Sequence, residues 1–326
     1  MALVLTLLAV SFLVAITVQL ATSVNWQMQG AGNLRDSVQL DAINRSGLSL
    51  VRAALLADLK ENQFDSIHDS WGKLTGEDAP TLFGAGALKI NITDLSGLLQ
   101  VNALVPDEKN QTEFQKKQTL QINLWKRFLT SGKFAVADDA EADKIIDALI
   151  DWIDENDTER DNGAENGYYL SRSPSYPARN GPVTYLTELL LIRDMTKELF
   201  YGNDQDQKLA LADYLTVAGR DGKINVNSAP AEILMALDPA GNMTEQAAKD
   251  LVEFAREEDN MAALASPQWV TSQSGINLST EGLAVVKSSC FKVSVTARLV
   301  SLTRSGTGIL QRNDKGEQKL LYWEVR

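Results

Sequence analysis

The chain opens with an uninterrupted apolar run and continues with apolar positions at helical spacing. Residues 1 to 21, MALVLTLLAVSFLVAITVQLA, contain no charged side chain. As a helix rising about 1.5 Å per residue, this run would reach roughly 31 Å, close to the hydrocarbon thickness of a bilayer. No proline follows before Asn62, and apolar residues recur at helical spacing at Leu48, Val51, Leu55 and Leu59. The pattern predicts one long helix, first in lipid or against neighbours and then packed on a domain.

Two alternatives for the apolar run stay open. A cleavable secretory signal usually starts with Lys or Arg and has an apolar stretch of only about 7 to 15 residues, whereas this run is apolar from Met1 onward. An ordinary signal-anchor helix followed by an amphipathic core helix would give the same pattern. The first charges after the run are Arg35 and Asp36, so the charges alone do not place the C-terminal part outside the membrane. A short basic leader that has already been removed would resolve the orientation.

Alternating sequences bracket a helical middle section. Ala87 to Leu95 (ALKINITDL) alternates like a half-buried strand, and Leu98 to Val101 is a second candidate. Phe291 to Arg304 alternates throughout and, with GILQRN, a turn at Asp314 to Gly316 and KLLYWEVR, predicts an antiparallel meander of two or three strands. Between them, helices are predicted in LQINLWKRFL, EADKIIDALIDWID, TYLTELLLIRDMTKELF, AEILMAL and EQAAKDLVEFAREE.

These elements predict an α+β fold in which a helical domain is inserted into a helix-plus-sheet domain. The predicted parts are an anchor at 1–21, the N-terminal helix and first strands at 22–101, the inserted helical domain at 102–279 and the C-terminal strands at 280–326. A faint repeat relates LLQVNAL and a later helix to KINVNSAPAEILMAL and the helix after it. The insertion is therefore expected to hold two related lobes of helix-hairpin-helix or SAM-like type.

The helix-hairpin-helix pattern does not predict DNA binding here. In such modules a tight glycine hairpin presents backbone amides to a phosphate. Here the hairpin reads Asp238 to Asn242, and acidic residues follow at Glu245, Asp250, Glu253, Glu257 and Glu258. These carboxylates would repel a phosphate, so we expect a purely structural use of the motif. The formal net charge of -12 also disfavours nucleic acid as a partner.

The rarity of cysteine and histidine excludes several classes of site. Cys290 is the single cysteine, which excludes an intrachain disulfide and any cysteine cluster for zinc or iron-sulfur. His68 is the single histidine, which excludes a multi-histidine metal site. It lies between Asp65 and Asp69, an arrangement found in acid/base pairs, but no nucleophile elbow or oxyanion loop accompanies it. We expect a structural histidine, no catalytic residue and no organic cofactor.

The segment from Asp151 to Glu165, DWIDENDTERDNGAE, places seven carboxylates within fifteen residues. Such crowding suits a hard cation with oxygen ligands, such as calcium, although a solvated acidic loop is the alternative. The segment is not an EF-hand, because that loop would need glycine at Asn162 and glutamate at Tyr168. The candidate ligands, of which the first is the least certain, are Asp151, Asp154, Asp157, Asp161 and Glu165. A weaker oxygen-rich stretch is Asn203 to Gln207.

Five sequence blocks resemble the general secretion pathway K proteins, the large minor pseudopilins of bacterial type II secretion. In chain order they are MALVLTLLAVSFL, DSIHDSWG, LIDWIDEND with GAENGYY, PSYPARNGP with TELLLI, and GKINVNSAPAEILMAL. The resemblance covers essentially the whole chain. It implies a pilin-like fold, in which the long N-terminal helix packs on an antiparallel sheet, with a large helical insertion. It also implies calcium in that insertion.

The resemblance further implies a place at the tip of a periplasmic pseudopilus. The expected partners are other minor pseudopilins, with exported proteins or the outer-membrane secretin as further candidates. The chain would cross the bacterial inner membrane once and keep its C-terminal bulk in the periplasm. A minor pilin of a type IV pilus or competence system, and a membrane-tethered metal-dependent hydrolase, are the alternative functions. A pseudopilin and a minor pilin would both act by assembly and not as enzymes, unlike the hydrolase.

Leu5 carries a physical argument for the tip. If Met1 is the first mature residue, most subunits of these filaments have Glu at this position, where the carboxylate neutralises a neighbour's buried terminal amine. A buried charge without a partner costs several kcal/mol. A subunit with Leu5 therefore fits poorly inside a filament and better at its end. Without the resemblance, Leu5 is one more lipid-facing residue.

Overall fold

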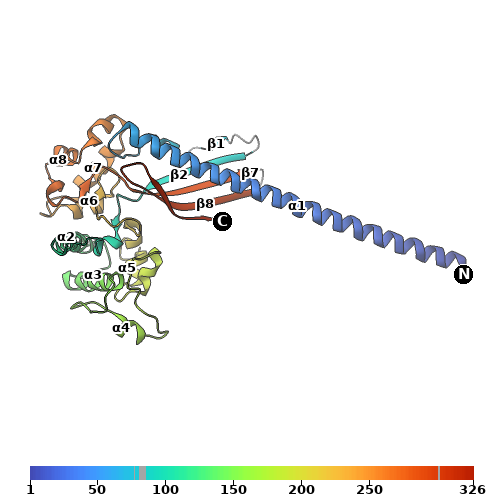
Figure 1. Cartoon of the computed structure of the whole chain (residues 1–326), viewed down its shortest axis with the longest axis horizontal. Coiled ribbons are helices and arrows are strands. Elements are labelled where there is room, and N and C mark those ends of the chain that lie inside the picture. Colours follow the sequence, from blue (N-terminus) through green and yellow to red (C-terminus); the bar gives the residue numbers. More distant parts are fainter. Residues whose placement is uncertain (77, 81–85, 300–301) are drawn as a thin grey trace.

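A long N-terminal helix projects from a folded body made of a sheet and a group of short helices (Figure 1). The computed structural model describes all residues except 77, 81–85 and 300–301. Helix α1 runs from Ala2 to Glu61, which confirms the predicted continuous helix. Its N-terminal half stands clear of the body, and its C-terminal half lies along the sheet (Figure 1).

The sheet has five antiparallel strands in the order β1-β2-β7-β8-β9. Their bounds are Asp78–Pro80, Gly86–Asp94, Cys290–Leu299, Leu302–Arg312 and Gln318–Val325. Strand β2 pairs with β7, so the sheet joins segments about 200 residues apart in the chain, as the register of Ile90 with Val295 shows. The predicted first strand and the C-terminal antiparallel meander are both present.

The second half of α1 packs on the sheet because its apolar residues share one face. Its buried apolar side chains are Leu40, Ile43, Leu48, Val51 and Leu55. They contact the inward side chains of β2, β7 and β8, among them Ile90 and Val293. At Gly47 the helix lies so close to β7 that an added Cβ would be 2.5 Å from Val295 Cγ1.

A helical body is inserted between β2 and β7. Its first lobe contains β3 (Leu99–Gln100), η2 (Val101–Leu104), α2 (Gln111–Leu129), α3 (Asp139–Ile153), α4 (Asn166–Leu170), η3 (Leu186–Leu191), α5 (Lys197–Tyr201), η4 (Leu211–Tyr214) and β4 (Leu215–Thr216). Its second contains β5 (Ile224–Asn225), α6 (Ala231–Leu237), α7 (Glu245–Arg256), η5 (Glu258–Ala265), α8 (Gln268–Ser274), η6 (Leu278–Glu281) and β6 (Ala284–Val285). A short turn, η1 (Gly72–Leu74), lies between α1 and β1.

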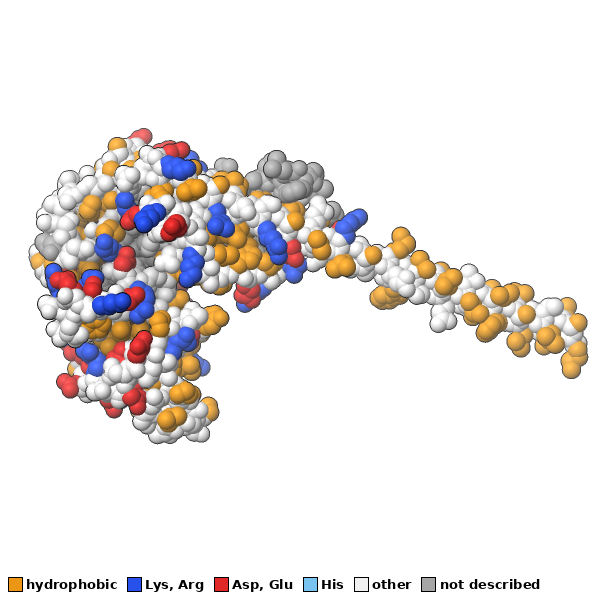
Figure 2. Space-filling model, in the orientation of Figure 1, with side chains coloured by type: hydrophobic (Ala, Val, Ile, Leu, Met, Phe, Trp, Pro, Cys, Tyr) orange, Lys and Arg blue, Asp and Glu red, His pale blue; other side chains and the backbone are white. Residues whose placement is uncertain are grey.

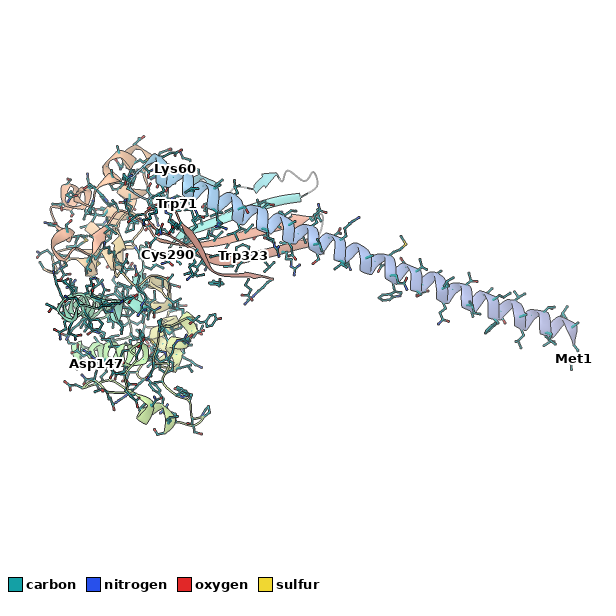
Figure 3. All side chains as sticks on the ribbon, in the orientation of Figure 1. Met1, Lys60, Trp71, Asp147, Cys290 and Trp323 are labelled. Carbon is teal, nitrogen blue, oxygen red and sulfur yellow. The ribbon has the colours of Figure 1, made fainter. Side chains whose placement is uncertain are left out.

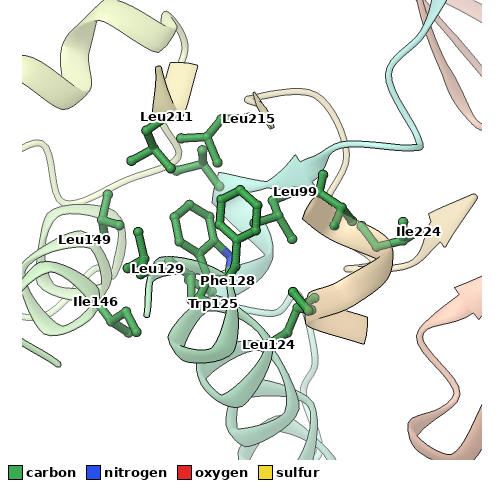
Figure 4. Close-up of a cluster of buried hydrophobic side chains, with 14 of the residues drawn as sticks. Leu99, Leu124, Trp125, Phe128, Leu129, Ile146, Leu149, Leu211, Leu215 and Ile224 are labelled. Atoms are coloured by element: carbon green, nitrogen blue, oxygen red, sulfur yellow. The ribbon is translucent and has the colours of Figure 1, made fainter. Parts of the chain in front are cut away.

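The helical body has its own hydrophobic core, separate from the core between α1 and the sheet. Figure 4 shows its centre, where Trp125 and Phe128 of α2 lie among leucines and isoleucines from both lobes. This core begins at Leu99 and ends at Val286, so the two lobes form one packed unit. This helical unit lies at the C-terminal end of α1, remote from Met1 (Figure 3).

Three predicted elements differ from the structure. The alternating stretch Phe291 to Arg304 is two strands, because β7 ends at Leu299 and β8 begins at Leu302. The predicted helix over Thr184 to Phe200 is broken into η3 and α5, since Asp194 has a φ of 64° and the Thr196 hydroxyl accepts from the Leu199 amide to start a new helix. The candidate strand at Leu98 to Val101 is only β3, which pairs with β4 inside the helical body.

Candidate functional site

The projecting half of α1 is left uncovered by the residues that the structure describes. Residues 1 to 31 are all exposed, and the first charged side chain of the chain is Arg35. Among the described residues, α1 is the helix long and apolar enough to cross a membrane. Figure 2 shows hydrophobic side chains along this helix and charged ones only near the body. An aqueous environment would therefore leave a large apolar surface uncovered.

Three of the predicted metal ligands form a cluster in the first lobe, with two of them buried and Asp154 partly exposed. Asp151 lies in the last turn of α3, Asp154 follows it, and Glu165 precedes α4. One carboxylate oxygen of each lies within 4.8 Å of the other two. Asp151 is 0% exposed and Glu165 is 3% exposed. The chain thus brings together three carboxylates that the sequence spreads over fifteen residues, and two of them, Asp151 and Glu165, are buried.

The cluster is electrostatically incomplete on its own. Asp151 Oδ1 and both carboxylate oxygens of Glu165 are buried without a hydrogen-bond partner. Burial raises the pKa of Asp151 to about 6. Burial, followed by repulsion from Asp151 and Asp154, raises the pKa of Glu165 to about 8. A hard divalent cation would supply the missing charge and take up the free oxygens, so the residues fit calcium.

The loop around the cluster is held by residues that the sequence analysis did not single out. Asp147, on α3 (Figure 3), accepts hydrogen bonds from Arg160 Nε at 2.8 Å and Asn162 Nδ2 at 3.1 Å. Gly163 packs on Asp151, and an added Cβ would lie 1.9 Å from Asp151 Oδ2. In the sequence, the role of Asp147 is indicated by its position one helical turn before Asp151.

The remaining predicted ligands lie beside the cluster or apart from it. Asp157 Oδ1 accepts from the backbone and side-chain nitrogens of Asn166 at 3.3 and 3.0 Å, next to Glu165. Asp161 instead lines a separate hollow of about 420 Å³ with Asp147 and Arg160. In the second oxygen-rich stretch, Asn203 Oδ1 accepts from the Gln205 and Asp206 amides, so it closes a turn.

The backbone amides of the hairpin between α6 and α7 are hydrogen-bonded to an aspartate of the hairpin itself. The carboxylate of Asp238 accepts from the amides of Ala240, Asn242 and Met243 at 3.0, 2.6 and 2.9 Å. In a phosphate-binding hairpin these amides would face the ligand. Here a buried carboxylate already satisfies them, which agrees with the structural use expected from the sequence.

His68 connects the two parts of the molecule. Its Nε2 lies 3.0 Å from the carbonyl oxygen of Ala255, at the end of α7. Asp69, its neighbour in sequence, accepts from the Ser66 amide at 2.6 Å and from Asn62. These contacts are those of a structural histidine and a structural aspartate at the junction of helix and insertion.

Sequence comparison identifies relatives in bacterial secretion. Two family models described as type II secretion system protein K match residues 89–202 and 224–285, which together make up more than half of the chain. The protein K of Aeromonas hydrophila is 26% identical over 204 residues, covering 61% of this chain and 60% of the relative. That of Pseudomonas aeruginosa is 25% identical over 206 residues, covering 59% and 53%. The matched segment thus spans less than two thirds of either relative.

A solved structure shows the same fold. The match is in the GspK-GspI-GspJ complex of the type II secretion system of enterotoxigenic Escherichia coli, with a TM-score of 0.64 and 16% identity. It covers 90% of this chain and 98% of that one. The long helix, antiparallel sheet and helical insertion are thus those of the pilin-like α+β fold expected from the sequence. On the matched family models and this agreement of fold, the chain belongs to the type II secretion system protein K family.

Proposed function

We propose that this chain is a minor pseudopilin that works by assembly, as a membrane-anchored subunit at the tip of a type II secretion pseudopilus. The observation that carries the proposal is the projecting half of α1, which is apolar, uncharged and uncovered. At about 1.5 Å per residue the 60-residue helix is ~90 Å long. A bilayer accounts for only about 20 of these residues.

The helix between the bilayer and the sheet needs other helices around it. From residue 22 to residue 39 the helix is still largely exposed, with apolar side chains at Val24, Trp26, Met28, Leu34 and Val38. These are 47 to 71% exposed. Helices of the same kind from neighbouring subunits would cover them, as expected for a filament built around a helical centre.

The location of the helical body supports a position at the tip. It is held beyond the C-terminal end of α1, at the end of the molecule remote from the membrane anchor (Figure 1). A subunit stacked further along the filament would meet this body, whereas subunits on the membrane side would not. Leu5, which supplies no carboxylate to a following neighbour, favours the same position.

The partners proposed for this chain are other minor pseudopilins, because the related GspK was solved in complex with GspI and GspJ. The anchor would lie in the bacterial inner membrane and the folded body in the periplasm. Exported proteins or the secretin would meet the tip during transport across the outer membrane.

Charges placed on the exposed helix test this proposal. Trp26→Asp with Met28→Asp puts two charges on the apolar positions, and Gln27→Asp with Gln29→Asp puts two on polar positions of the same turns. Each full-length variant is co-expressed with the pseudopilins of its own operon and purified in detergent. The first pair should reduce co-purified partner at least tenfold and the control pair much less. Equal recovery with both pairs would contradict the helix-packing function.

We also infer that the cluster of Asp151, Asp154 and Glu165, with Asp157 beside it, binds calcium as a structural ion. The bound ion would join the end of α3 to the start of α4, and no catalytic step involves it. Calcium at about 100 times its Kd would add about 2.7 kcal/mol to the free energy of unfolding. A metal-dependent hydrolase, the alternative, would need an open coordination position for water and substrate, whereas Asp151 and Glu165 are buried.

Thermal melts in calcium and in chelator test the ion. The variant Asp151→Asn with Glu165→Gln should lose the calcium-dependent rise in Tm. A control, Glu159→Gln with Asp161→Asn, removes the same charge from the same loop outside the cluster and should keep the rise. Because folding raises the pKa of Glu165, its protonated form stabilises the metal-free protein at low pH. This stabilisation is lost as pH rises toward about 8. The neutral variant should therefore melt higher than the metal-free wild type at pH 8.

A further inference from the structure

A single guanidinium lies among carboxylates where α1, the sheet and the helical body meet. Arg312 of β8 donates to Asp58 Oδ2 at 3.1 Å, to the carbonyl oxygen of Leu55 at 2.6 Å, and to Asp65 Oδ1. Its guanidinium carbon is 5.1 Å from the centroid of the Phe291 ring. Arg312, Asp58 and Asp65 are 4%, 1% and 2% exposed. This arrangement removes both charge signs from water.

A third buried carboxylate, that of Asp69, adds negative charge that the single guanidinium of Arg312 does not balance. One oxygen from each of Asp58, Asp65 and Asp69 lies within 4.8 Å of the others. Asp69 is buried and is held by neutral donors, the Ser66 amide and Asn62 Nδ2. Three buried carboxylates therefore share one guanidinium. Like charges at this distance do not all ionise in a buried site, so the cluster holds on to protons that an exposed aspartate would release.

The same cluster fastens the helical body to the rest of the molecule. Asp65 Oδ2 accepts from the Ser288 amide at 2.8 Å, and the Asp65 amide donates to the Val286 carbonyl at 2.7 Å. The Asp65 carbonyl accepts from the side-chain nitrogens of Asn225 and Asn227, both at 3.1 Å. Ser288 and Asn225 also donate to Asp94 at the end of β2. Asp65 is thus at the centre of the contact between the two cores.

Water can reach the cluster through a cleft of about 600 Å³, whose lining includes Asp58, Asp65 and Arg312. The charged groups that line this cleft from other elements are Arg220, Asp221, Lys223, Lys287 and Asp314. These groups are exposed and of mixed sign, so salt screens them, unlike the buried cluster.

We propose that Asp58, Asp65, Asp69 and Arg312 form a proton-linked clamp, which fastens the helical body to α1 and the sheet when protonated and loosens as pH rises. Deprotonation leaves negative charges that Arg312 alone does not balance. Burial, against the opposing attraction of Arg312, raises the pKa of Asp65 to about 7, and burial also raises the pKa of Asp58 and Asp69. A pKa raised on folding stabilises the protein at low pH, and this stabilisation disappears as pH passes the folded-state value.

The test is the pH dependence of unfolding of the full-length protein in detergent. With a pKa near 7 folded and about 3.8 unfolded, Asp65 alone should raise the unfolding equilibrium constant about thirtyfold between about pH 5.5 and 8.5. Asp65→Asn and Asp58→Asn remove one carboxylate each and should flatten this dependence. Asp41→Asn is the matched control, because Asp41 lies on α1 but pairs with Arg304 at the surface, at 3.0 Å.

A local measurement separates the clamp from other acidic groups. Asp151 and Glu165 add a pH dependence of the same sign, so the decisive quantity is the difference between wild type and each variant. Hydrogen exchange of the Ser288 amide, corrected for its intrinsic rate, should speed up at pH 8.5 in wild type and in Asp41→Asn, but not in Asp58→Asn. Should Asp65→Asn not fold, Asp58→Asn decides. A wild-type stability that is flat or rises over this pH range, or a slope unchanged in Asp58→Asn, overturns the proposal.

Discussion

At the residue scale, the acidic cluster depends on a glycine as well as on its carboxylates. Gly163 leaves the space into which the Asp151 carboxylate fits, since an added Cβ would lie 1.9 Å from Asp151 Oδ2 and 2.7 Å from its Cγ. The Asp151 side chain is fixed on α3 and also accepts from the Arg160 amide. The loop would therefore have to move to make room for even a methyl group.

We predict that Gly163→Ala abolishes the calcium response and lowers the free energy of unfolding by about 1–3 kcal/mol, the usual effect of overpacking a buried site. Calorimetric titration with calcium and chemical denaturation measure the two effects. Gly167→Ala is the matched control, because a Cβ there has no neighbour within 4 Å. Calcium binding by Gly163→Ala at wild-type affinity would show that the cluster is not the binding site.

Leu5 is the residue where a new charge should change assembly without changing the fold. Its side chain is 73% exposed and contacts no other part of the chain that would resist a substitution. Leu5→Glu should leave the melting of the folded body unchanged and alter the yield of co-purified pseudopilins, because a carboxylate in apolar surroundings must find a positive partner. Detergent pull-down and secretion assays measure this. Unchanged partner recovery and secretion would remove the argument from Leu5 for the tip.

At the element scale, the hairpin between α6 and α7 depends on one internal acceptor. Asp238→Ala leaves the amides of Ala240, Asn242 and Met243 without their carboxylate. The expected loss is about 1–3 kcal/mol of unfolding free energy, measured by denaturant titration. Asp250→Ala, at an exposed position of α7 where the carboxylate accepts from the Gln246 side chain, should cost much less. Equal losses for both variants would mean that Asp238 does not hold the hairpin.

The sequence predicts those elements whose packing imposes a long, regular pattern. The helix α1 was predictable because its apolar run and later one-sided leucines extend over 60 residues. Strand β2, with Leu88, Ile90 and Ile92 inward, alternates because one face meets α1. The turn at Asp314 to Gly316 was predictable from its residues, and Gly316 adopts a positive φ of 80° there.

Other features depend on contacts that a local pattern does not contain. Alternation continues across the end of β7 into β8, so it gives no sign that the chain reverses after Leu299. A run of leucines from Leu186 suggested a helix, but Asp194 and Thr196 stop and restart it. In the acidic loop, the crowded carboxylates predict a cluster, but no local pattern indicates that Glu165 enters it while Asp161 lines a separate hollow.

At the scale of the whole molecule, the N-terminal apolar run of α1 and the folded body are physically separate. Buried side chains of α1 begin at Leu40. No described residue before it is buried in the core between α1 and the sheet, and the buried residues of the second core all lie in the helical body. The apolar run thus presents exposed apolar surface without adding to the packing of the body.

We therefore predict that deletion of residues 1–21 gives a soluble, folded fragment. The fragment keeps every buried residue of both cores, so its cooperative melt and calcium response should match those of the full-length protein in detergent. Circular dichroism and size-exclusion chromatography measure its folding and its solubility.

Deletion of residues 1–48 is the control that locates the boundary. It removes Leu40, Ile43 and Leu48, which are buried against the sheet. Each large apolar side chain lost from a core costs about 2–5 kcal/mol, and a domain is stable by only about 5–15 kcal/mol. The sheet should then unfold or aggregate, while the shorter deletion remains monomeric. If the shorter deletion also aggregates or loses its helical signal, the anchor and the folded body are not independent.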